Sequence, residues 1–481
     1  MITKFKRKCV PIVSGGAQPS RKVLALSMQT PNVPGAGGPT RSYYFLRTLA
    51  EETDLTLVCL SAGQHVGEGL SELCEHIIAP ELVCVKRTEQ SVTTSQIFRW
   101  LAIARVLGMP WRNHWYEFLL YFVQYALPQN HNTHHGFGKR LLTGCLKLWY
   151  RVAARWSNMP PITAFMYEPA YQAALPQIVR ACEARKFDIV WCEHSTMYPY
   201  LQRVQEFVKA PITICNSHNV ETLLQQRYEE KAEPGWSLEY QRQQTSIYRR
   251  IESDCYDTSN LVFTCSEEDS KAGRKLAPAG NFRVVGNGVD TDYFQPSANT
   301  SLADPPTVVY TGGFGYIPNQ DAVRHFIADI LPLIWESRPE CEFLFAGFEA
   351  EQMWQQLGTK DGRIKYVCSP ADIRPCFEEA WVFVVPIRVG GGTRLKVLEA
   401  MSMEKAIVST TVGAEGIPCI SGQHLIHADQ ASDFAKNVVE LLQDEQCRRQ
   451  MGATARQWVR EKYDWKILCD AIRTDLQPLL N

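Results

Sequence analysis

The segment 381–416, WVFVVPIRVGGGTRLKVLEAMSMEKAIVSTTVGAEG, decides how the second half of this chain folds. It predicts a buried strand, a glycine loop, a helix, a second strand and a second glycine loop in direct succession. Two strands joined through a helix run parallel, and the connecting helix packs on their sheet. The segment therefore predicts an α/β fold with a parallel sheet.

Apolar runs of the same kind alternate with amphipathic segments along most of the chain, and they suit strands that are buried on both faces. The stretch 295–306, QPSANTSLADPP, divides them into two series and has the composition of a linker. We expect two tandem Rossmann-like domains, at 21–294 and 307–460, that face each other across a ligand cleft. The strand candidates are 23–28, 55–61, 187–193, 211–218, 261–266 and 282–287, then 307–312, 341–347, 364–368, 381–387, 405–410 and 424–428.

Composition sets broad limits on function. A chain of 481 residues with 45% hydrophobic and 21% charged residues is globular and too long for one ordinary domain. Its formal net charge of −1 provides no field that would recruit nucleic acid. The 16 cysteines show neither a CxxC nor a zinc-finger spacing, so we expect reduced structural thiols and a cytoplasmic location.

Two segments do not follow the alternation of apolar runs and amphipathic segments. Residues 1–20 predict a flexible basic leader, because their apolar stretch is too short for a signal peptide. Residues 87–160 predict an aromatic and basic insertion that contains an amphipathic helix at 138–156. We expect that helix to pack on its own domain, and the alternative is peripheral contact with an anionic membrane surface. No apolar run reaches the roughly 20 residues of a membrane-spanning helix.

The histidines of the insertion do not predict a metal site. His131, His134 and His135 lie in a polar loop, NHNTHH, that offers no fixed positioning for metal ligands. We therefore expect no metal and no other cofactor.

The glycine loop and its helix have the features of a diphosphate site. Gly390, Gly391 and Gly392 let backbone N–H groups approach an anion, and the positive end of the following helix points to the same place. Arg394 and Lys396 lie near the first helical turn, where cations are unfavourable unless an anion neutralises them.

Glu399 lies in an apolar part of the same helix, where a buried carboxylate needs a donor such as a ribose hydroxyl. The alternative is an ion pair with Lys396, three residues earlier.

The run PIRVGGGTRLKVLEAMSMEKAIVSTTVGAEGI resembles the donor-site signature of the group 1, or family 4, retaining glycosyltransferases, which have the GT-B fold. The resemblance implies that Glu399 holds the nucleotide ribose. It assigns Gly390–Gly392 and Thr393 to the sugar–diphosphate side of the pocket. In many members a glutamate that contacts the donor sugar stands at the position of Gly391, so the family's glutamate pair is incomplete here.

Other segments resemble the same family in the right order. The segment 24–51 resembles its first strand, glycine-rich loop and first helix, with Gly35, Gly37 and Gly38 lining the cleft. The segment 284–294 resembles the NGVD end of the N-terminal domain, and 461–481 resembles the last helix, which crosses back to that domain. The segment 308–323 resembles the first strand and loop of the C-terminal domain, with Gly312 and Gly313 close to the donor.

That loop departs from the family in one respect. Many members have an Arg and a Lys there to neutralise the diphosphate, whereas 311–323 contains no basic residue. We expect Arg394 and Lys396 to take over this function.

Two histidines are candidates on the acceptor side. His194 follows the run FDIVWCE and His218 follows PITICNS, so both stand at carboxyl ends of predicted strands, where such sheets bind ligands. His194 best matches the family's histidine near the reacting centre. Asn219 and Glu221 match the loop after the next strand.

These features predict a retaining transfer of sugar from a nucleotide diphosphate sugar to a hydroxyl of a saccharide or lipid-linked acceptor, in polysaccharide or glycolipid synthesis. A nucleotide-sugar epimerase or a phosphorylase on the same scaffold is one alternative, because a fold does not fix a reaction. A non-catalytic binding or partner subunit is another. A dehydrogenase is disfavoured, because the first glycine loop, PGAGGPTR, is not GxGxxG.

Overall fold

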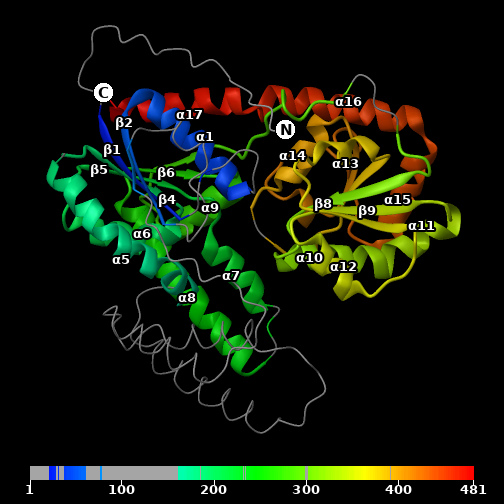
Figure 1. Cartoon of the computed structure of the whole chain (residues 1–481), viewed down its shortest axis with the longest axis horizontal. Helices are drawn as coiled ribbons and strands as arrows, with labels where there is room; N and C mark the ends of the chain where they lie inside the picture. Colours follow the sequence, from blue (N-terminus) through cyan, green and yellow to red (C-terminus); the bar gives the residue numbers. More distant parts are fainter. Residues whose placement is uncertain are drawn as a thin grey trace, which may run out of the picture.

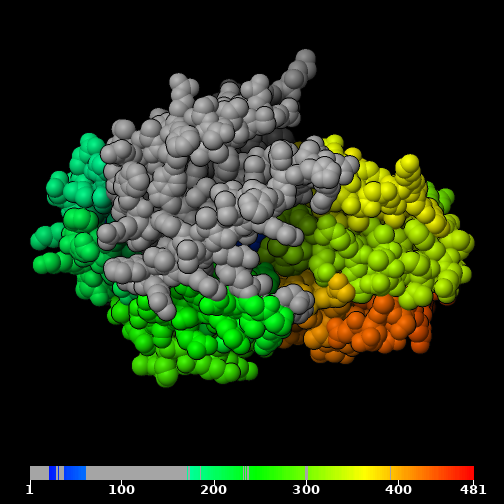
Figure 2. All heavy atoms as spheres, turned by 90° about the horizontal axis from the view of Figure 1, so that it is seen from below, coloured from blue at the N-terminus to red at the C-terminus, as the bar shows by residue number. Residues whose placement is uncertain are grey.

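The computed structural model describes residues 21–28, 31, 37–60, 76–78, 161–184, 186–230, 232, 234–297, 302–390 and 392–480. They form two α/β units in tandem, coloured blue to green and yellow to red in Figure 1. Figure 2 shows the green and the yellow-to-orange surfaces of these units side by side. The expected leader, the insertion and its three histidines, Gly35 and Gly391 lie outside the described residues.

The N-terminal domain is built on a seven-stranded parallel sheet with the order β3-β2-β1-β4-β5-β6-β7. Its strands are β1 (Lys22–Ser27), β2 (Asp54–Cys59), β3 (His76–Ile78), β4 (Ile189–Glu193), β5 (Ile212–Asn216), β6 (Leu261–Thr264) and β7 (Phe282–Val284). The strand order reverses between β1 and β4. Ligands bind outside the carboxyl ends of the strands at such a switch point.

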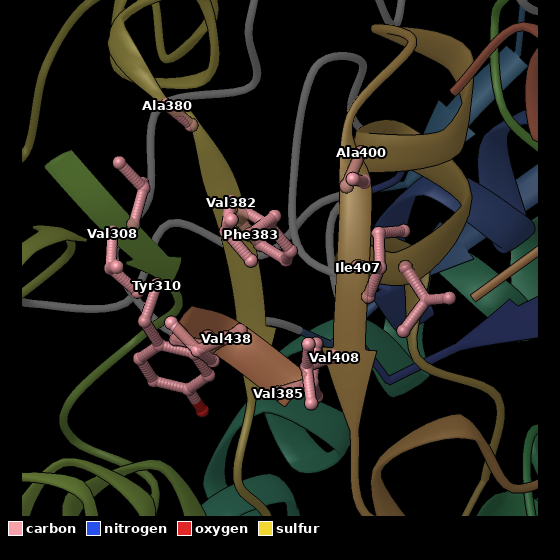
Figure 3. Close-up of a cluster of buried hydrophobic side chains, with 14 of the residues drawn as sticks. Val308, Tyr310, Ala380, Val382, Phe383, Val385, Ala400, Ile407, Val408 and Val438 are labelled. Atoms are coloured by element: carbon pink, nitrogen blue, oxygen red, sulfur yellow. The ribbon is translucent and has the colours of Figure 1, made fainter. Parts of the chain in front are cut away.

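The C-terminal domain repeats this plan in a six-stranded parallel sheet with the order β10-β9-β8-β11-β12-β13. Its strands are β8 (Thr307–Thr311), β9 (Glu342–Gly347), β10 (Ile364–Cys368), β11 (Val382–Val385), β12 (Ala406–Ser409) and β13 (Ile426–His427). Figure 3 shows Val385 and Val408 on neighbouring strands, with Val438 beside them in the same buried cluster. The order reverses between β8 and β11, so the loop after β11 lies at the switch point.

Helices cover the two sheets. In the N-terminal domain they are α1 (Gly37–Glu52), α5 (Pro161–Ala184), α6 (Tyr198–Gln205), α7 (Glu221–Glu230), α8 (Trp236–Thr258) and α9 (Glu267–Leu276). In the C-terminal domain they are α10 (Ile317–His325), α11 (Leu331–Ser337), α12 (Ala350–Leu357), α13 (Arg374–Glu379), α14 (Leu395–Ser402), α15 (Ala431–Gln443) and α16 (Glu445–Lys462). None of these described helices is both long and apolar enough to cross a membrane.

The last helix, α17 (Trp465–Leu480), packs on the N-terminal domain beside α1, so the C-terminus lies next to the first sheet (Figure 1). The rings of Tyr44 and Trp465 stack with centroids 4.3 Å apart. Leu468, Ile472 and Leu476 belong to the same buried cluster as β1 and β2. This apolar contact ties the end of the chain to the first domain.

The predicted fold class, with two Rossmann-like sheets in tandem, is confirmed. Each predicted apolar run overlaps one strand of the structure. β3 was not predicted, because a three-residue edge strand that pairs only with β2 is too short to show a hydrophobic period.

The fold also brings together three thiols that are far apart in the sequence. The Sγ atoms of Cys192, Cys215 and Cys255, from β4, β5 and α8, lie within 4.8 Å of one another and are buried. Sequence spacing does not reveal this cluster, because it arises from strand neighbours and a helix above them. The three thiols pack within an apolar cluster of the first domain.

Candidate functional site

The glycine loop after β11 leads directly into α14. Gly390 and Gly392 have φ values of 149° and 76°, which side chains rarely adopt. Arg394 occupies the position before the first residue of α14 with an extended backbone, and both it and Thr393 are buried. The predicted loop and the positive end of its helix therefore lie together, while Gly391 is outside the described residues.

Lys396, on the first turn of α14, forms its hydrogen bonds to side chains of its own domain. Its Nζ donates to the Tyr310 hydroxyl at 2.8 Å and to Asn319 Oδ1 at 2.9 Å. Burial, reinforced by the neighbouring Arg394, lowers the pKa of Lys396 well below its usual value. Its diphosphate role stays a prediction, and this environment disfavours the charged form on which that role depends.

Glu399 lies one helical turn further along α14. Burial raises the pKa of its carboxyl to about 7, against the opposing effect of Lys396. The alternative ion pair with Lys396 is absent from the described structure, where Lys396 Nζ bonds to Tyr310 and Asn319 instead. A carboxyl of raised pKa favours its charged form again when a ligand donates hydrogen bonds to it.

Two of the other predicted glycines, Gly312 and Gly37, approach the first turn of α14. A Cβ atom on Gly312 would lie 2.8 Å from Lys396 Nζ, whereas one on Gly313 would meet no atom within 4 Å. Gly37 and Gly38 form the first residues of α1, and a Cβ atom on Gly37 would lie 3.7 Å from Leu395 Cγ. The first turns of α1 and α14 thus meet across the two domains (Figure 1).

His194 and His218 lie together at the carboxyl ends of β4 and β5. Their ring centroids are 5.0 Å apart, and His194 is buried with a φ of 82°, unusual for any residue except glycine. His194 Nδ1 accepts from the Thr196 N–H at 3.2 Å, which leaves the proton on Nε2, 3.3 Å from Glu221 Oε1. Strained backbone of this kind persists where surrounding structure holds it and is frequent at functional sites.

Glu193 is a buried carboxylate that the sequence did not single out. It accepts hydrogen bonds from Trp191, His218 and other neighbours, with His218 Nε2 at 2.8 Å. Ser42 Oγ and Asn216 Nδ2 are the other donors. Burial opposes its charge, but these hydrogen bonds lower the pKa of Glu193 below its usual value. Burial in turn lowers the pKa of His218 to about 4, so His218 is neutral near pH 7.

Glu252, on α8, contacts both the loop that follows His194 and the start of α7, which follows His218. Its carboxyl oxygens accept from the backbone N–H groups of Glu221 and Thr222 at the start of α7, at 2.7 and 2.8 Å. The Ser195 hydroxyl, beside His194, donates to the same carboxyl at 3.1 Å. Burial raises the pKa of Glu252 to about 7. Glu252 therefore positions Glu221 and the His194 loop at once.

Replacing Glu252 by glutamine is expected to lower stability and to change its pH dependence. The folded carboxyl keeps its proton up to about pH 7, against an ordinary value of 4.5, so the folded state binds more protons between these values. The contribution of this carboxyl to the free energy of unfolding is therefore fully present below pH 4.5 and is lost as the pH rises to 7. Urea unfolding of wild type and E252Q from pH 5 to pH 8 measures this. Equal pH slopes in both proteins would contradict the assignment.

The loop of His218 and Asn219, after β5, lies against the glycine loop of the other domain. A Cβ atom on Gly392 would lie 2.8 Å from Asn219 Oδ1 and 3.9 Å from the His218 carbonyl oxygen. Asn219 Nδ2 donates to Glu221 Oε1 at 2.7 Å, and this same oxygen faces His194. Residues predicted separately for the donor and acceptor sides therefore meet at one place between the domains.

This geometry defines the class of protein: two Rossmann-like domains of the GT-B fold with a polar site at their junction. Residues 305–444 match the family described as glycosyl transferases group 1. A curated relative, an uncharacterized 44.6 kDa protein in the cps region of Klebsiella pneumoniae, is 24% identical over 172 residues. That match covers 34% of this chain and 44% of the relative, less than half of its length.

Two solved structures share the fold over nearly the whole chain. Anabaena HepE in complex with UDP and glucose has a TM-score of 0.59 and 12% identity, covering 95% of this chain and 100% of that chain. Sucrose-phosphate synthase from Thermosynechococcus elongatus has a TM-score of 0.61 and 14% identity, covering 95% and 99%. At such identities the likeness establishes the GT-B fold.

Proposed function

We propose that this chain is a glycosyltransferase that moves a sugar from a nucleotide diphosphate sugar to a hydroxyl acceptor with retention of anomeric configuration. One observation carries the proposal: the glycine loop before α14 lies directly against the loop of His218 and Asn219. A donor bound at the first loop would present its sugar to the second. The group 1 match at 305–444 and the UDP and glucose held by HepE support a nucleotide sugar as the donor.

In this proposal the residues of the donor site and His194 have separate tasks. Glu399 accepts hydrogen bonds from the ribose, while Gly390, Gly392 and Thr393 bring backbone groups to the diphosphate at the positive end of α14. His194 orients the acceptor or sugar hydroxyl. The bond from the anomeric carbon to the diphosphate breaks, a bond to the acceptor oxygen forms, and a phosphate oxygen takes the acceptor proton. The N-terminal end of α14 and the predicted cations Arg394 and Lys396 stabilise the leaving group without a metal ion.

A binding panel tests the donor part of the proposal. Nucleoside diphosphates of uracil, guanine, adenine and thymine, and their glucose conjugates, are added to the protein at increasing concentration. The matching ligand is expected to raise the free energy of unfolding by about 2.7 kcal/mol at 100 times its Kd, because it binds the native state alone, and the unfolding midpoint rises with it. The absence of any shift across the panel would overturn the donor site.

Product analysis separates transfer from its alternatives. With the matching nucleotide sugar and saccharide or glycolipid acceptors, we expect a glycosylated acceptor whose new linkage keeps the anomeric configuration of the donor. Conversion of the nucleotide sugar without an acceptor would instead show an epimerase. Tight binding without turnover across the acceptors would show a binding subunit.

A further inference from the structure

Arg227, on the N-terminal helix α7, reaches across the domain junction to the glycine loops. Its Nη1 donates to the Gly390 carbonyl oxygen at 2.5 Å and to Glu415 Oε2 at 2.7 Å. Its Nη2 pairs with the other carboxylate oxygen of Glu415. The guanidinium thus contacts the glycine loop predicted to bind the diphosphate and also the second glycine loop of the segment 381–416, although it comes from the opposite domain.

Two cations of the C-terminal domain are predicted for the donor site: Arg394 lies buried beside Gly390, and Lys396 is held by hydrogen bonds within its own domain. The loop 311–323 contains no basic residue, and Lys396 Nζ is bonded to Tyr310 and Asn319 in a position that disfavours its charge. Arg227, by contrast, is always charged, because guanidinium stays protonated at all working pH values. Hydrogen bonding to Glu415 raises the pKa of Arg227 further.

We propose that Arg227 is a diphosphate-binding residue supplied by the N-terminal domain, and that Glu415 occupies its guanidinium until the donor arrives. Carboxylate and phosphate both accept two parallel hydrogen bonds from a guanidinium, so one replaces the other without a change in geometry. This inference rests on the proposed glycosyltransferase function. It adds to the donor site a side chain from the N-terminal domain, which the motifs of the C-terminal domain do not indicate.

The space beside this ion pair agrees with such an exchange. A cavity of about 20 Å³ is lined by Asn219, Arg227, Gly392, Glu415 and their neighbours. That volume holds about one water molecule, so in this arrangement the cavity has no room for a diphosphate between Arg227 and Glu415. Because Arg227 and Glu415 are on different domains, donor binding and the relative position of the domains are coupled.

Isothermal titration of R227Q, E415Q and wild type with UDP, GDP, ADP and TDP, and with the matching monophosphates, tests the exchange. R227Q is expected to weaken the tightest diphosphate about tenfold, the value of one charge-assisted hydrogen bond, and its monophosphate less than about twofold. E415Q is expected to bind the diphosphate about threefold more tightly than wild type, because the competing carboxylate is gone.

R242Q is the matched control, because Arg242 pairs with Glu229 on the exposed surface of α8 and α7. Equal losses of diphosphate and monophosphate in R227Q, or a loss in E415Q as large as that in R227Q, would show a structural clamp and overturn the proposal. Unchanged diphosphate binding in R227Q would overturn it as well. Failure of every nucleotide to bind wild type would instead overturn the proposed function itself.

Discussion

Replacing Glu399 by glutamine is expected to weaken binding of the matching nucleotide sugar by about 10- to 100-fold. The carboxylate would accept hydrogen bonds from ribose hydroxyls, and hydrogen bonds to a charged group contribute roughly 1.5–3 kcal/mol each. Glutamine keeps the size of the side chain but loses the charge and one acceptor oxygen. Titration calorimetry measures the change in Kd directly.

The pH dependence of binding gives a second readout for Glu399. Burial raises the pKa of its carboxyl to about 7, so the wild-type protein must lose this proton before ribose hydroxyls can donate to both oxygens. Wild-type affinity is therefore expected to rise between pH 6 and pH 8, and that of E399Q to stay flat. A nucleotide sugar is the right probe, because its substituted diphosphate does not itself titrate in this range.

The control for this substitution is E440Q, which removes an exposed carboxylate of the same domain that faces Lys436. It is expected to bind the nucleotide sugar as wild type does, at every pH. If E399Q bound as tightly as E440Q, the ribose role of Glu399 would be wrong, whatever the activity of the enzyme.

The fold was predictable because its strands are buried on both faces. A run such as IVWC at 189–192 is apolar without interruption, and only a parallel sheet covered by helices accepts such runs repeatedly. β3 escaped prediction because three residues at a sheet edge carry no such pattern. Loop positions followed from the strands, since in a parallel sheet the residues after each carboxyl end gather at one edge.

The site was predictable only where a motif or a strand end marks it. His194, His218 and Asn219 follow strands, so their meeting follows from topology. Glu252 and Arg227 lie within polar helices, where a glutamate or an arginine is ordinary, and their importance arises from partners on other elements. The carboxylate of Glu193 ends an apolar strand, and a charged residue at that place is a sign of a site that the sequence itself carries.

Lys396 illustrates a different limit. Its place on the first helical turn suggests a free cation, but the sequence does not show that Tyr310, on β8, and Asn319, on α10, will surround its ammonium group. A charge near a helix start is therefore a weaker guide to anion binding than the three-dimensional partners of that charge. This difference is the reason that Arg227 is a stronger candidate for the diphosphate than Lys396.

Replacing His194 by alanine is expected to lower kcat by about 10²- to 10³-fold, the usual contribution of a positioned polar group at a reacting centre, with donor Kd changed less than about threefold. The imidazole is held by the Thr196 N–H and by Glu221, so its proton-bearing nitrogen has a fixed direction. Alanine keeps the Cβ atom at this strained position and removes only the ring. Steady-state kinetics with donor and acceptor varied separately measures both effects.

Two further variants separate a chemical role of His194 from a structural one. H325A is the control, because His325, the last residue of α10, pairs with Asp329 in the next turn of its own domain, and it is expected to retain full kcat. E221Q leaves the imidazole in place but removes the charge opposite Nε2, and it is expected to lower kcat by about tenfold. A kcat of H194A within threefold of wild type would exclude His194 from the reaction. Equal losses of donor affinity and kcat would show that it only supports the junction of the two domains.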